Sequence, residues 1–217
     1  MAFINGVIGV SRKKVGNLVA YRNSGKAIVR QYLGTGEIAN PRTAGQIAQR
    51  ARFSMIAQQL AQASAFFNRT FAAYRRYFVG FAAAMHFNWA DLITGSYPLY
   101  TVDHSKLLIS KGGLLPLDGL TATANANHSV TLSWTDNSGQ ANARTDDEVC
   151  LMLWLPNLSS TVKMFPKMDV AQRNAGTYAD STPLQLGGEV AHVYVCVHRR
   201  GTAKYSNSQY CGSVTLQ

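Results

Sequence analysis

The sequence predicts an α+β protein in two parts, a basic β-hairpin with helical structure followed by a β-sandwich. Three observations support this division. Positive charge is concentrated in the first 95 residues, and apolar residues recur every three or four positions between residues 53 and 85. After residue 114, short runs of β-forming residues alternate with turn residues. We therefore expect a basic hairpin and helical domain over residues 1–95, a connector over 96–113 and a sandwich over 114–217.

The charge distribution indicates that the two parts have different partners. The first 95 residues contain 12 Lys and Arg but only two acids, Glu37 and Asp91, whereas the remaining 122 residues contain nine bases and nine acids. A field of one sign attracts a polyanion or an acidic protein, while a balanced surface needs only to keep a domain soluble. We therefore expect the first part to contact an anionic partner.

A basic β-hairpin is predicted near the start of the chain. Residues 17–22 and 26–32 are β-forming runs, and Asn23-Ser24-Gly25 between them is typical of a hairpin turn. Residues 6–36 contain six Lys or Arg and no acid. The charges are either a contact surface for phosphates or an acidic protein, or protection of a strand edge against aggregation. The predicted contact residues, including two from the following helix, are Arg12, Lys13, Lys14, Arg22, Lys26, Arg30, Arg42 and Arg50.

Helical structure is predicted from about residue 41 to residue 92. Asn40 can cap this segment and Pro41 can occupy its first turn. A straight helix of about 50 residues would be roughly 75 Å long, so a helical hairpin broken near residues 64–70 stays open as the alternative. The polar face adds further arginines without acids three or four residues away, which favours an anionic surface: Arg52, Arg69, Arg75 and Arg76.

The apolar face of the helical segment carries an aromatic stripe. Such a stripe is usually core, but a straight helix in a 95-residue domain could not bury it alone. We therefore expect it to pack on a second helix, on the sandwich or on another copy of the chain. The residues predicted for oligomer or partner packing are Phe53, Phe67, Phe71, Tyr74 and Phe78.

Residues 114–217 predict a β-sandwich. Residues 130–134 alternate strictly, whereas 149–155 and 190–198 are apolar runs typical of buried strands. The stretch 120–134, ending in Val-x-Leu-x-Trp, resembles the second strand of fibronectin type III or immunoglobulin-like domains. Tyr194-Val195-Cys196, with Ser206-Asn207-Ser208 after it, resembles their penultimate strand and last hairpin. A tryptophan on the second strand departs from antibody domains and places their inter-sheet disulfide in doubt.

The whole layout is similar to an uncharacterised family of Bacteroidetes and their phages. The residues that carry this resemblance are the glycine-rich basic start and Asn40-Pro41-Arg42-Thr43-x-x-Gln46-x-x-x-Arg50-x-x-Phe53, followed by a helical middle and a sandwich. The family has no established activity. The resemblance implies a setting in phage particles, where immunoglobulin-like modules decorate or join structural proteins, although a fold alone does not fix a function.

No pattern typical of an enzyme is present, so we predict no enzymatic activity, no cofactor and no metal site. Ser24-Gly25-Lys26 lacks the other residues of a phosphate loop, and the five histidines show no ligand spacing. Asp146-Asp147-Glu148 is interpreted as a solvated loop, with a cation site as the minor alternative.

Cellular location is predicted from the absence of export signals. The N-terminus lacks the features of a secretory signal, and the most apolar stretch, residues 77–90, is shorter than the roughly 20 residues that cross a bilayer. The cysteines Cys150, Cys196 and Cys211 are interpreted as free thiols in a reducing compartment, with a Cys150–Cys196 disulfide as the alternative.

We therefore expect an oligomeric, non-enzymatic structural protein of a bacteriophage virion, made in the cytoplasm of the bacterial host. Its basic half would contact an acidic virion protein or packaged DNA, and its sandwich would mediate subunit or surface contacts. The alternative hypothesis is a cellular protein that binds nucleic acid without sequence specificity. A surface adhesion module is a third hypothesis, and it requires an export route that the N-terminus does not show.

Overall fold

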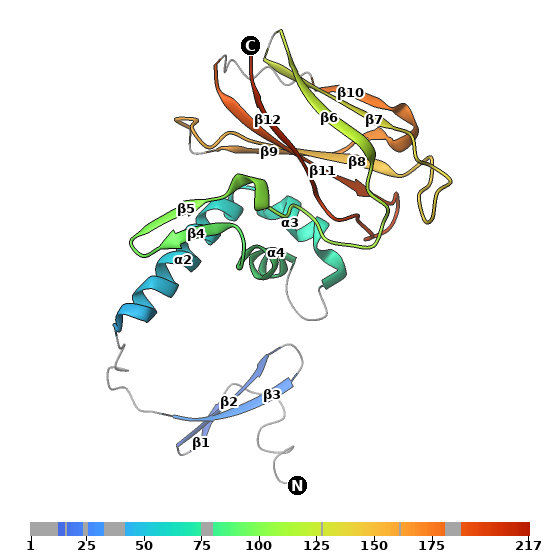
Figure 1. The fold of residues 1–217 in the computed structure, drawn as a ribbon. Helices are drawn as coiled ribbons and strands as arrows, with labels where there is room; N and C mark the ends of the chain where they lie inside the picture. Colours follow the sequence, from blue (N-terminus) through green and yellow to red (C-terminus); the bar gives the residue numbers. More distant parts are fainter. Residues whose placement is uncertain are drawn as a thin grey trace. The chain divides into compact units, whose positions relative to one another are not determined.

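The chain forms two compact units, Met1–Thr43 and Ala44–Gln217, which we call the N-terminal unit and the C-terminal unit (Figure 1). The structure is a computed structural model. It describes residues 13–15, 17–23, 26–32, 42–74, 80–126, 128–160, 162–180 and 188–217.

The N-terminal unit contains a small antiparallel sheet. Its strands are β1 (Lys13–Val15), β2 (Leu18–Asn23) and β3 (Lys26–Gln31), in the order β1-β2-β3. Asn23 pairs with Lys26, so the predicted hairpin is confirmed. Among the described side chains of this sheet, Ala20 is buried, while Leu18 and Val29 are 48% and 42% exposed. Among the side chains that the structure describes in this sheet, few are therefore buried.

The C-terminal unit begins with a helical layer. Its elements are α2 (Ala44–Ala61), α3 (Ser64–Thr70), the 3₁₀ helix η1 (Ala72–Tyr74) and α4 (Gly80–Asn88). Of the two alternatives left open by the sequence, the straight helix is wrong, because the chain breaks between α2 and α3 and α4 packs against both of them. The break lies at residues 62–63, whereas residues 64–70, where the hairpin alternative places it, form helix α3. Because the helices fold back on one another, their apolar residues pack together and against a sheet of the sandwich. The hairpin alternative is therefore closer to the structure.

The contact between α3 and α4 is fixed by Asn68 and Gly80. The Asn68 side chain accepts a hydrogen bond from the backbone N–H of Phe81 at 2.8 Å, which satisfies a donor in the first turn of α4. A Cβ on Gly80 would lie 2.6 Å from the Asn68 carbonyl oxygen, so only glycine permits this approach.

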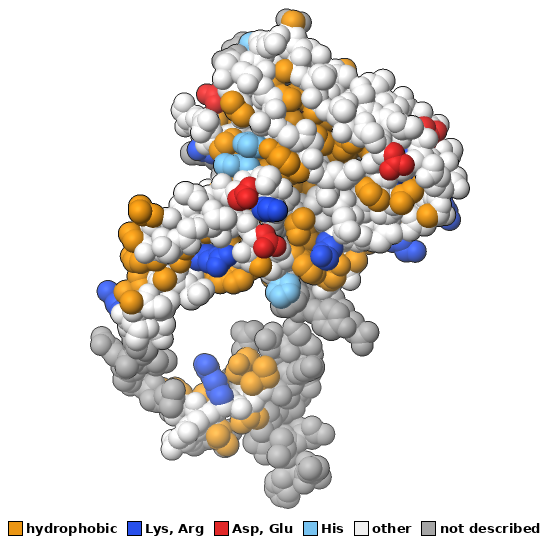
Figure 2. All heavy atoms as spheres, in the orientation of Figure 1, with side chains coloured by type: hydrophobic (Ala, Val, Ile, Leu, Met, Phe, Trp, Pro, Cys, Tyr) orange, Lys and Arg blue, Asp and Glu red, His pale blue; other side chains and the backbone are white. Residues whose placement is uncertain are grey.

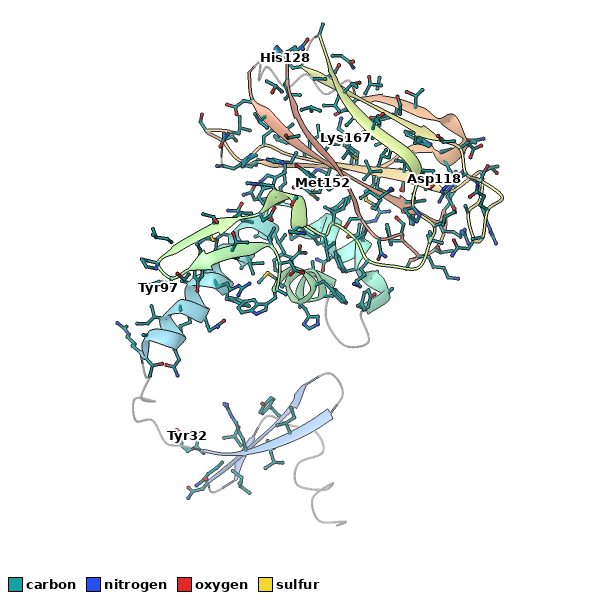
Figure 3. The ribbon with its side chains drawn as sticks, viewed as in Figure 1. Tyr32, Tyr97, Asp118, His128, Met152 and Lys167 are labelled. Carbon is teal, nitrogen blue, oxygen red and sulfur yellow. The ribbon has the colours of Figure 1, made fainter. Side chains whose placement is uncertain are left out.

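A short hairpin connects the helices to the sandwich, where the sequence predicts an irregular connector. It consists of β4 (Ile93–Ser96) and β5 (Leu99–Val102), with Tyr97 at its tip (Figure 3), and is followed by the 3₁₀ helix η2 (His104–Lys106). The Tyr100 hydroxyl donates to the Ala48 carbonyl oxygen at 3.1 Å. This bond ties the hairpin to α2.

Seven strands form the β-sandwich, and this part of the fold prediction is confirmed. One sheet has the order β10-β7-β6 and the other has the order β12-β11-β8-β9, with every pair antiparallel. The 3₁₀ helix η3 (Arg173–Ala175) follows β9. The strands are β6 (Asp118–Asn125), β7 (Ser129–Thr135), β8 (Glu148–Trp154), β9 (Met164–Gln172), β10 (Thr177–Asp180), β11 (Val190–His198) and β12 (Gln209–Thr215).

The four-stranded sheet is the middle layer of three. On one of its faces, Leu151 and Val195 pack against the three-stranded sheet. On the other face, Met152 and Tyr194 share a core with residues of the helices, and Figure 3 shows Met152 between the strands and the helical layer. Two covered faces explain why 149–155 and 190–198 are continuous apolar runs instead of alternating ones.

The shared core also changes the division into domains. The sequence places a boundary between residues 95 and 114, whereas the structure joins the helices and the sandwich in one compact unit that starts at Ala44. Phe67 and Phe71 are fully buried in the cluster that contains Trp154 of β8. The helices cannot be separated from the sandwich without exposing this cluster. Among the described residues, no helix has both the length and the apolar character needed to cross a membrane.

Candidate functional site

The residues predicted to contact an anion belong to both units. Arg12 lies outside the described residues. Arg30 is exposed on β3, and its guanidinium carbon lies 5.6 Å from the ring centroid of Tyr21. Arg42 is exposed at the end of the N-terminal unit, and Arg50 is exposed on α2 of the C-terminal unit. Four further residues have described backbones in the N-terminal strands, whereas their side chains lie outside the described part: Lys13, Lys14, Arg22 and Lys26.

Two other helical arginines have partners inside the C-terminal unit. Arg52 donates to the carbonyl oxygens of Trp89 and Ala90 at 2.8 and 2.9 Å, just beyond the end of α4. Its guanidinium carbon also lies 5.3 Å from the Trp89 ring centroid. Arg69 forms an ion pair with Asp169 on β9 at 3.7 Å. Cations near a helix C-terminus stabilise its carbonyl groups, so Arg52 has a structural role.

The aromatic stripe is divided between core and surface. Phe67 and Phe71 are covered by the sheet of their own chain, and Tyr74 is half-buried with its ring 4.8 Å from that of Phe87. Phe78 lies outside the described residues. Phe53 is 56% exposed. It contributes to a groove of about 380 Å³ lined by Phe53, Phe81, Ala82, Met85, His86 and Trp89.

Apolar side chains are also exposed around this groove. Tyr97 and Leu99, at the β4–β5 turn, are 49% and 80% exposed. Figure 2 shows hydrophobic side chains gathered over α2 and this hairpin. Of the residues predicted for partner packing, Phe53 is therefore the one that the structure leaves open on this surface.

The acidic run before β8 is not the solvated loop that the sequence predicts. Asp147 is 1% exposed. Its carboxylate accepts hydrogen bonds from Nε of Arg199 at 2.9 Å and from the backbone N–H of Arg144 at 2.9 Å, and it lies 3.5 Å from the buried Arg173 guanidinium. Burial alone would raise the pKa of Asp147, but the donors from Arg199 and Arg144 outweigh it and lower the pKa.

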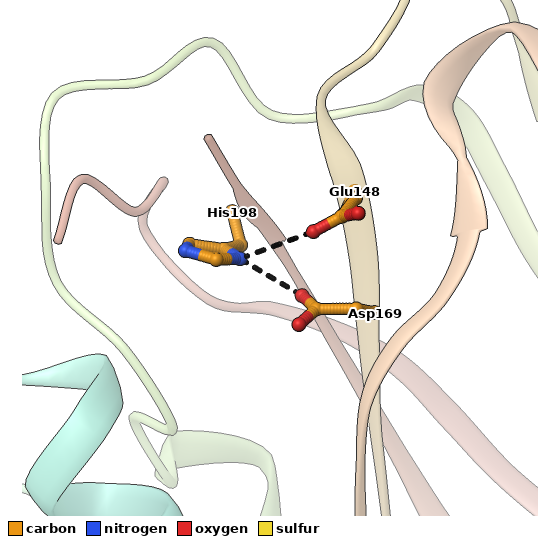
Figure 4. Close-up of side chains that lie close together, drawn as sticks. All are labelled: Glu148, Asp169 and His198. Atoms are coloured by element: carbon orange, nitrogen blue, oxygen red, sulfur yellow. Dashed lines mark hydrogen bonds and ion pairs between the residues drawn. The ribbon is translucent and has the colours of Figure 1, made fainter. Parts of the chain in front are cut away.

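The next residue in this run joins a polar cluster at one end of the middle sheet. The polar cluster consists of Glu148 on β8, Asp169 on β9 and His198 on β11, and Figure 4 shows the three side chains converging. Nδ1 of His198 lies 2.8 Å from Oδ1 of Asp169 and 3.6 Å from Oε2 of Glu148. Nε2 of His198 lies 2.8 Å from the Thr202 carbonyl oxygen.

A β-bulge brings Asp169 into the polar cluster. Val149 pairs with Ala171 and Leu151 pairs with Lys167, so residues 168–170 lie opposite the single Cys150. Asp169 has φ of 54°, in the left-handed region that few residues other than glycine adopt. Bulges re-aim side chains in this way and are common next to functional sites.

The polar cluster opens to solvent through a pocket of about 520 Å³. Arg69 and Arg200 line it, and Nε of Arg200 lies 3.5 Å from Glu148. On the buried side, the ring of Tyr205 stacks on His198 with centroids 4.6 Å apart. The pocket therefore combines two carboxylates, one imidazole and two mobile cations.

The Cys150 thiol beside the polar cluster is not activated as a nucleophile. Cys150 and Cys196 are opposite each other on β8 and β11, and both are free and buried. The hydrogen bond between the Cys150 thiol and Cys196, together with burial, raises the pKa of Cys150. Since the thiolate is the reactive form, the protonated Cys150 thiol is inert at neutral pH. Its Sγ donates to Asp169 at 3.6 Å.

Sequence reasoning missed the polar cluster because its members come from three strands. One signal was available, since Glu148 and His198 stand at the ends of two apolar runs that pair antiparallel. The position of Asp169 had no such signal, because a two-residue alternation cannot reveal where a bulge interrupts it.

The fold and this cluster define the class of protein as a β-sandwich with a helical layer on its outer face and a polar site at the end of the shared sheet. Residues 10–212 match a family described as "Family of unknown function (DUF6266)". The chain belongs to this family. No curated protein matches the chain.

Two solved structures with low similarity are fibronectin domains. The chicken CNTN1 FN1–FN3 domains give a TM-score of 0.38 at 8% identity, over 57% of this chain and 38% of that chain. The fn3 domain of the human collagen alpha-1(XX) chain gives 0.33 at 15% identity, over 48% of this chain and 87% of that chain. This chain thus spans well under half of the chicken protein's length.

Proposed function

We propose that this protein is an oligomeric, non-enzymatic structural protein of a bacteriophage virion. Its basic N-terminal part contacts an acidic virion protein or packaged DNA, and its C-terminal unit is the scaffold for subunit or surface contacts. The observation that carries the proposal is the charge distribution, with 12 bases and two acids in the first 95 residues. The virion setting rests on the sequence resemblance described above.

The composition of the N-terminal sheet supports a contact role. Small sheets that bury little apolar surface are marginally stable by themselves, and Ala20 is the one buried side chain among those described in this sheet. Leu18, Val29 and Arg30 are exposed on this sheet. A partner that covers the sheet and neutralises its charges would stabilise it.

Two features of the C-terminal unit support a scaffold rather than a catalyst. The buried thiol of Cys150 is kept protonated, and the ring of His198 is held at both nitrogens. The exposed apolar surface at Phe53, Tyr97 and Leu99 supports subunit contacts, since soluble monomers seldom expose such groups together.

The test is light-scattering mass of the full chain over a salt series, with and without a generic DNA duplex. We expect a large oligomer that forms without DNA, and mass spectrometry of purified particles should detect the protein. A monomer that is absent from particles contradicts the proposal. Phe53→Asp is expected to reduce the mass, and Asp146→Asn, a change at an exposed polar position, is its control.

A second candidate is a nucleic-acid-binding protein without sequence specificity, favoured by the same excess of bases. Counterion release predicts that log K falls with log salt at roughly −0.9 per phosphate, so six contacts give a slope of about −5. The triple change K13Q/K14Q/K26Q should reduce this slope by roughly 3. The matched change K106Q/R144Q/K204Q, at exposed positions of the C-terminal unit, should leave it unaltered. Binding that ignores salt eliminates this candidate.

A further inference from the structure

We propose that Glu148, Asp169 and His198 bind a divalent transition-metal ion, with Zn²⁺ as the best match, and that the ion ties three strands together at one end of the middle sheet. The sequence predicts no metal site because the spacing of these residues fits no motif. Their folded positions bring one imidazole nitrogen and two carboxylate oxygens within 4.8 Å of one another.

The donor distances fit a small ion. Ligand atoms about 2.0 to 2.2 Å from a tetrahedral Zn²⁺ are on the order of 3.3 Å apart. The distance from Nδ1 of His198 to Oδ1 of Asp169 is 2.8 Å, slightly shorter than that spacing. The distance from Nδ1 to Oε2 of Glu148 is 3.6 Å, slightly longer than it. Only small side-chain rotations are needed to admit the ion. One nitrogen and two oxygens form a donor set that suits Zn²⁺ and other first-row divalent ions, whereas Mg²⁺ prefers oxygen ligands alone.

The hydrogen bond on the far side of the imidazole is an independent observation. Nε2 of His198 faces the Thr202 carbonyl oxygen, which can only accept, so Nε2 carries a proton. In the neutral ring, Nδ1 then presents its lone pair to two carboxylates that also offer only lone pairs. A cation must lie between them, either a proton on Nδ1 or a metal ion. A backbone carbonyl that fixes the second nitrogen is the usual arrangement around a metal-bound histidine.

The bulge in β9 places Asp169 at the proposed metal site. Asp169 adopts a left-handed conformation that a non-glycine residue keeps only when its surroundings require it. As a result, Asp169 stands beside Cys150 and His198. His198 is 5% exposed, so the nitrogen donor is held rigidly while the carboxylates remain accessible from the pocket.

The charges around the site allow an ion to enter. Arg69 and Arg200 now pair with the carboxylates, but their side chains are 55% and 67% exposed and are free to turn toward solvent. The remaining titratable groups that face the polar cluster are the thiol of Cys150 and the hydroxyl of Tyr205. The pKa of each is raised, so both stay neutral. The pocket also has room for water as a further ligand.

The experiment is calorimetric titration of tag-free, chelator-treated full chain with ZnCl₂ and, separately, with MgCl₂. We expect one Zn²⁺ per chain, no Mg²⁺ binding, and a melting temperature that rises with Zn²⁺ concentration.

Variants separate this site from the other histidines. Glu148→Gln and His198→Gln are expected to lower Zn²⁺ affinity by roughly tenfold or more, whereas His86→Gln and His192→Gln should not change it. Thermal melts without metal identify any variant that fails to fold. The proposal is overturned if the unmodified chain binds no Zn²⁺, if Glu148→Gln and His198→Gln leave the affinity unaltered, or if His192→Gln abolishes binding. In the first case the three side chains form a structural hydrogen-bonded cluster without an ion.

Discussion

The middle sheet of the C-terminal unit and the sheet of the N-terminal unit have the same antiparallel pairing but opposite surroundings. In the middle sheet, Leu151 and Met152 are both fully buried although they point to opposite faces. In the N-terminal sheet, Leu18 and Val29 remain largely exposed. The stability of a sheet therefore depends more on the layers that pack on its faces than on its ladder of hydrogen bonds.

The largest expected effect is on the free energy of unfolding and tests the buried ion pair between Asp147 and Arg173. Asp147→Ala removes the only carboxylate within 4 Å of Arg173 among the described residues and leaves that guanidinium buried. Breaking a buried pair in this way lowers the free energy of unfolding by about 3–5 kcal/mol. Urea denaturation of the full chain measures it. Asp146→Ala is the control, since Asp146 is exposed and its loss should change stability by less than about 0.5 kcal/mol.

The next effect compares the two sheets directly. Leu151→Ala opens a cavity between the layers of the sandwich, and we expect a loss of about 3 kcal/mol in the free energy of unfolding. Val29→Ala shortens a half-exposed side chain in the N-terminal sheet, and we expect a loss below about 0.5 kcal/mol. Similar losses for the two variants would mean that the N-terminal sheet is covered in solution.

The smallest effect concerns pH. His104 stacks on His192 of β11 with ring centroids 4.3 Å apart. Burial lowers the pKa of His104, with a further contribution from the charge of His192, and burial lowers the pKa of His192. The unfolded chain therefore binds protons more readily, so this contribution to stability is complete above about pH 6.5 and is lost as the pH falls below it.

The measurement is the urea midpoint of the full chain between pH 7.5 and 5. His104→Asn should flatten the profile relative to the unmodified chain, while the exposed His86→Asn should not. The effect should be smaller than those above because both rings are partly open to water, which screens their charges. A steeper fall in the His104→Asn variant would contradict this explanation.

The sandwich and the basic hairpin could be predicted from sequence because their signals are local. Turn residues mark the hairpin, and β-forming runs mark the strands. The break after α2 could not be predicted, because Leu60, Ala63 and Phe67 keep helical spacing across it. The continuous apolar run 149–155 indicated a strand that is buried on both faces. It did not indicate that helices pack on one of those faces.

The site was less accessible to sequence reasoning than the fold. Composition predicts a basic contact surface without three-dimensional information, because excess charge can be read from the sequence, and this surface stays a prediction. The polar cluster depends instead on strand order and on the bulge at Asp169, which follow from long-range pairing. Asp147 and Glu148 are adjacent in sequence but serve different networks, one with Arg173 and the other with His198.

The bulge in β9 has a consequence for assembly. β9 is an edge of the four-stranded sheet, and such an edge is a template on which another chain can add a strand. Pro166 has no N–H to donate, Lys167 carries a charge, and the kink at Asp169 breaks the regular repeat of donors and acceptors. These features make β9 a poor template for strand addition, so extension of one continuous sheet through this edge is disfavoured.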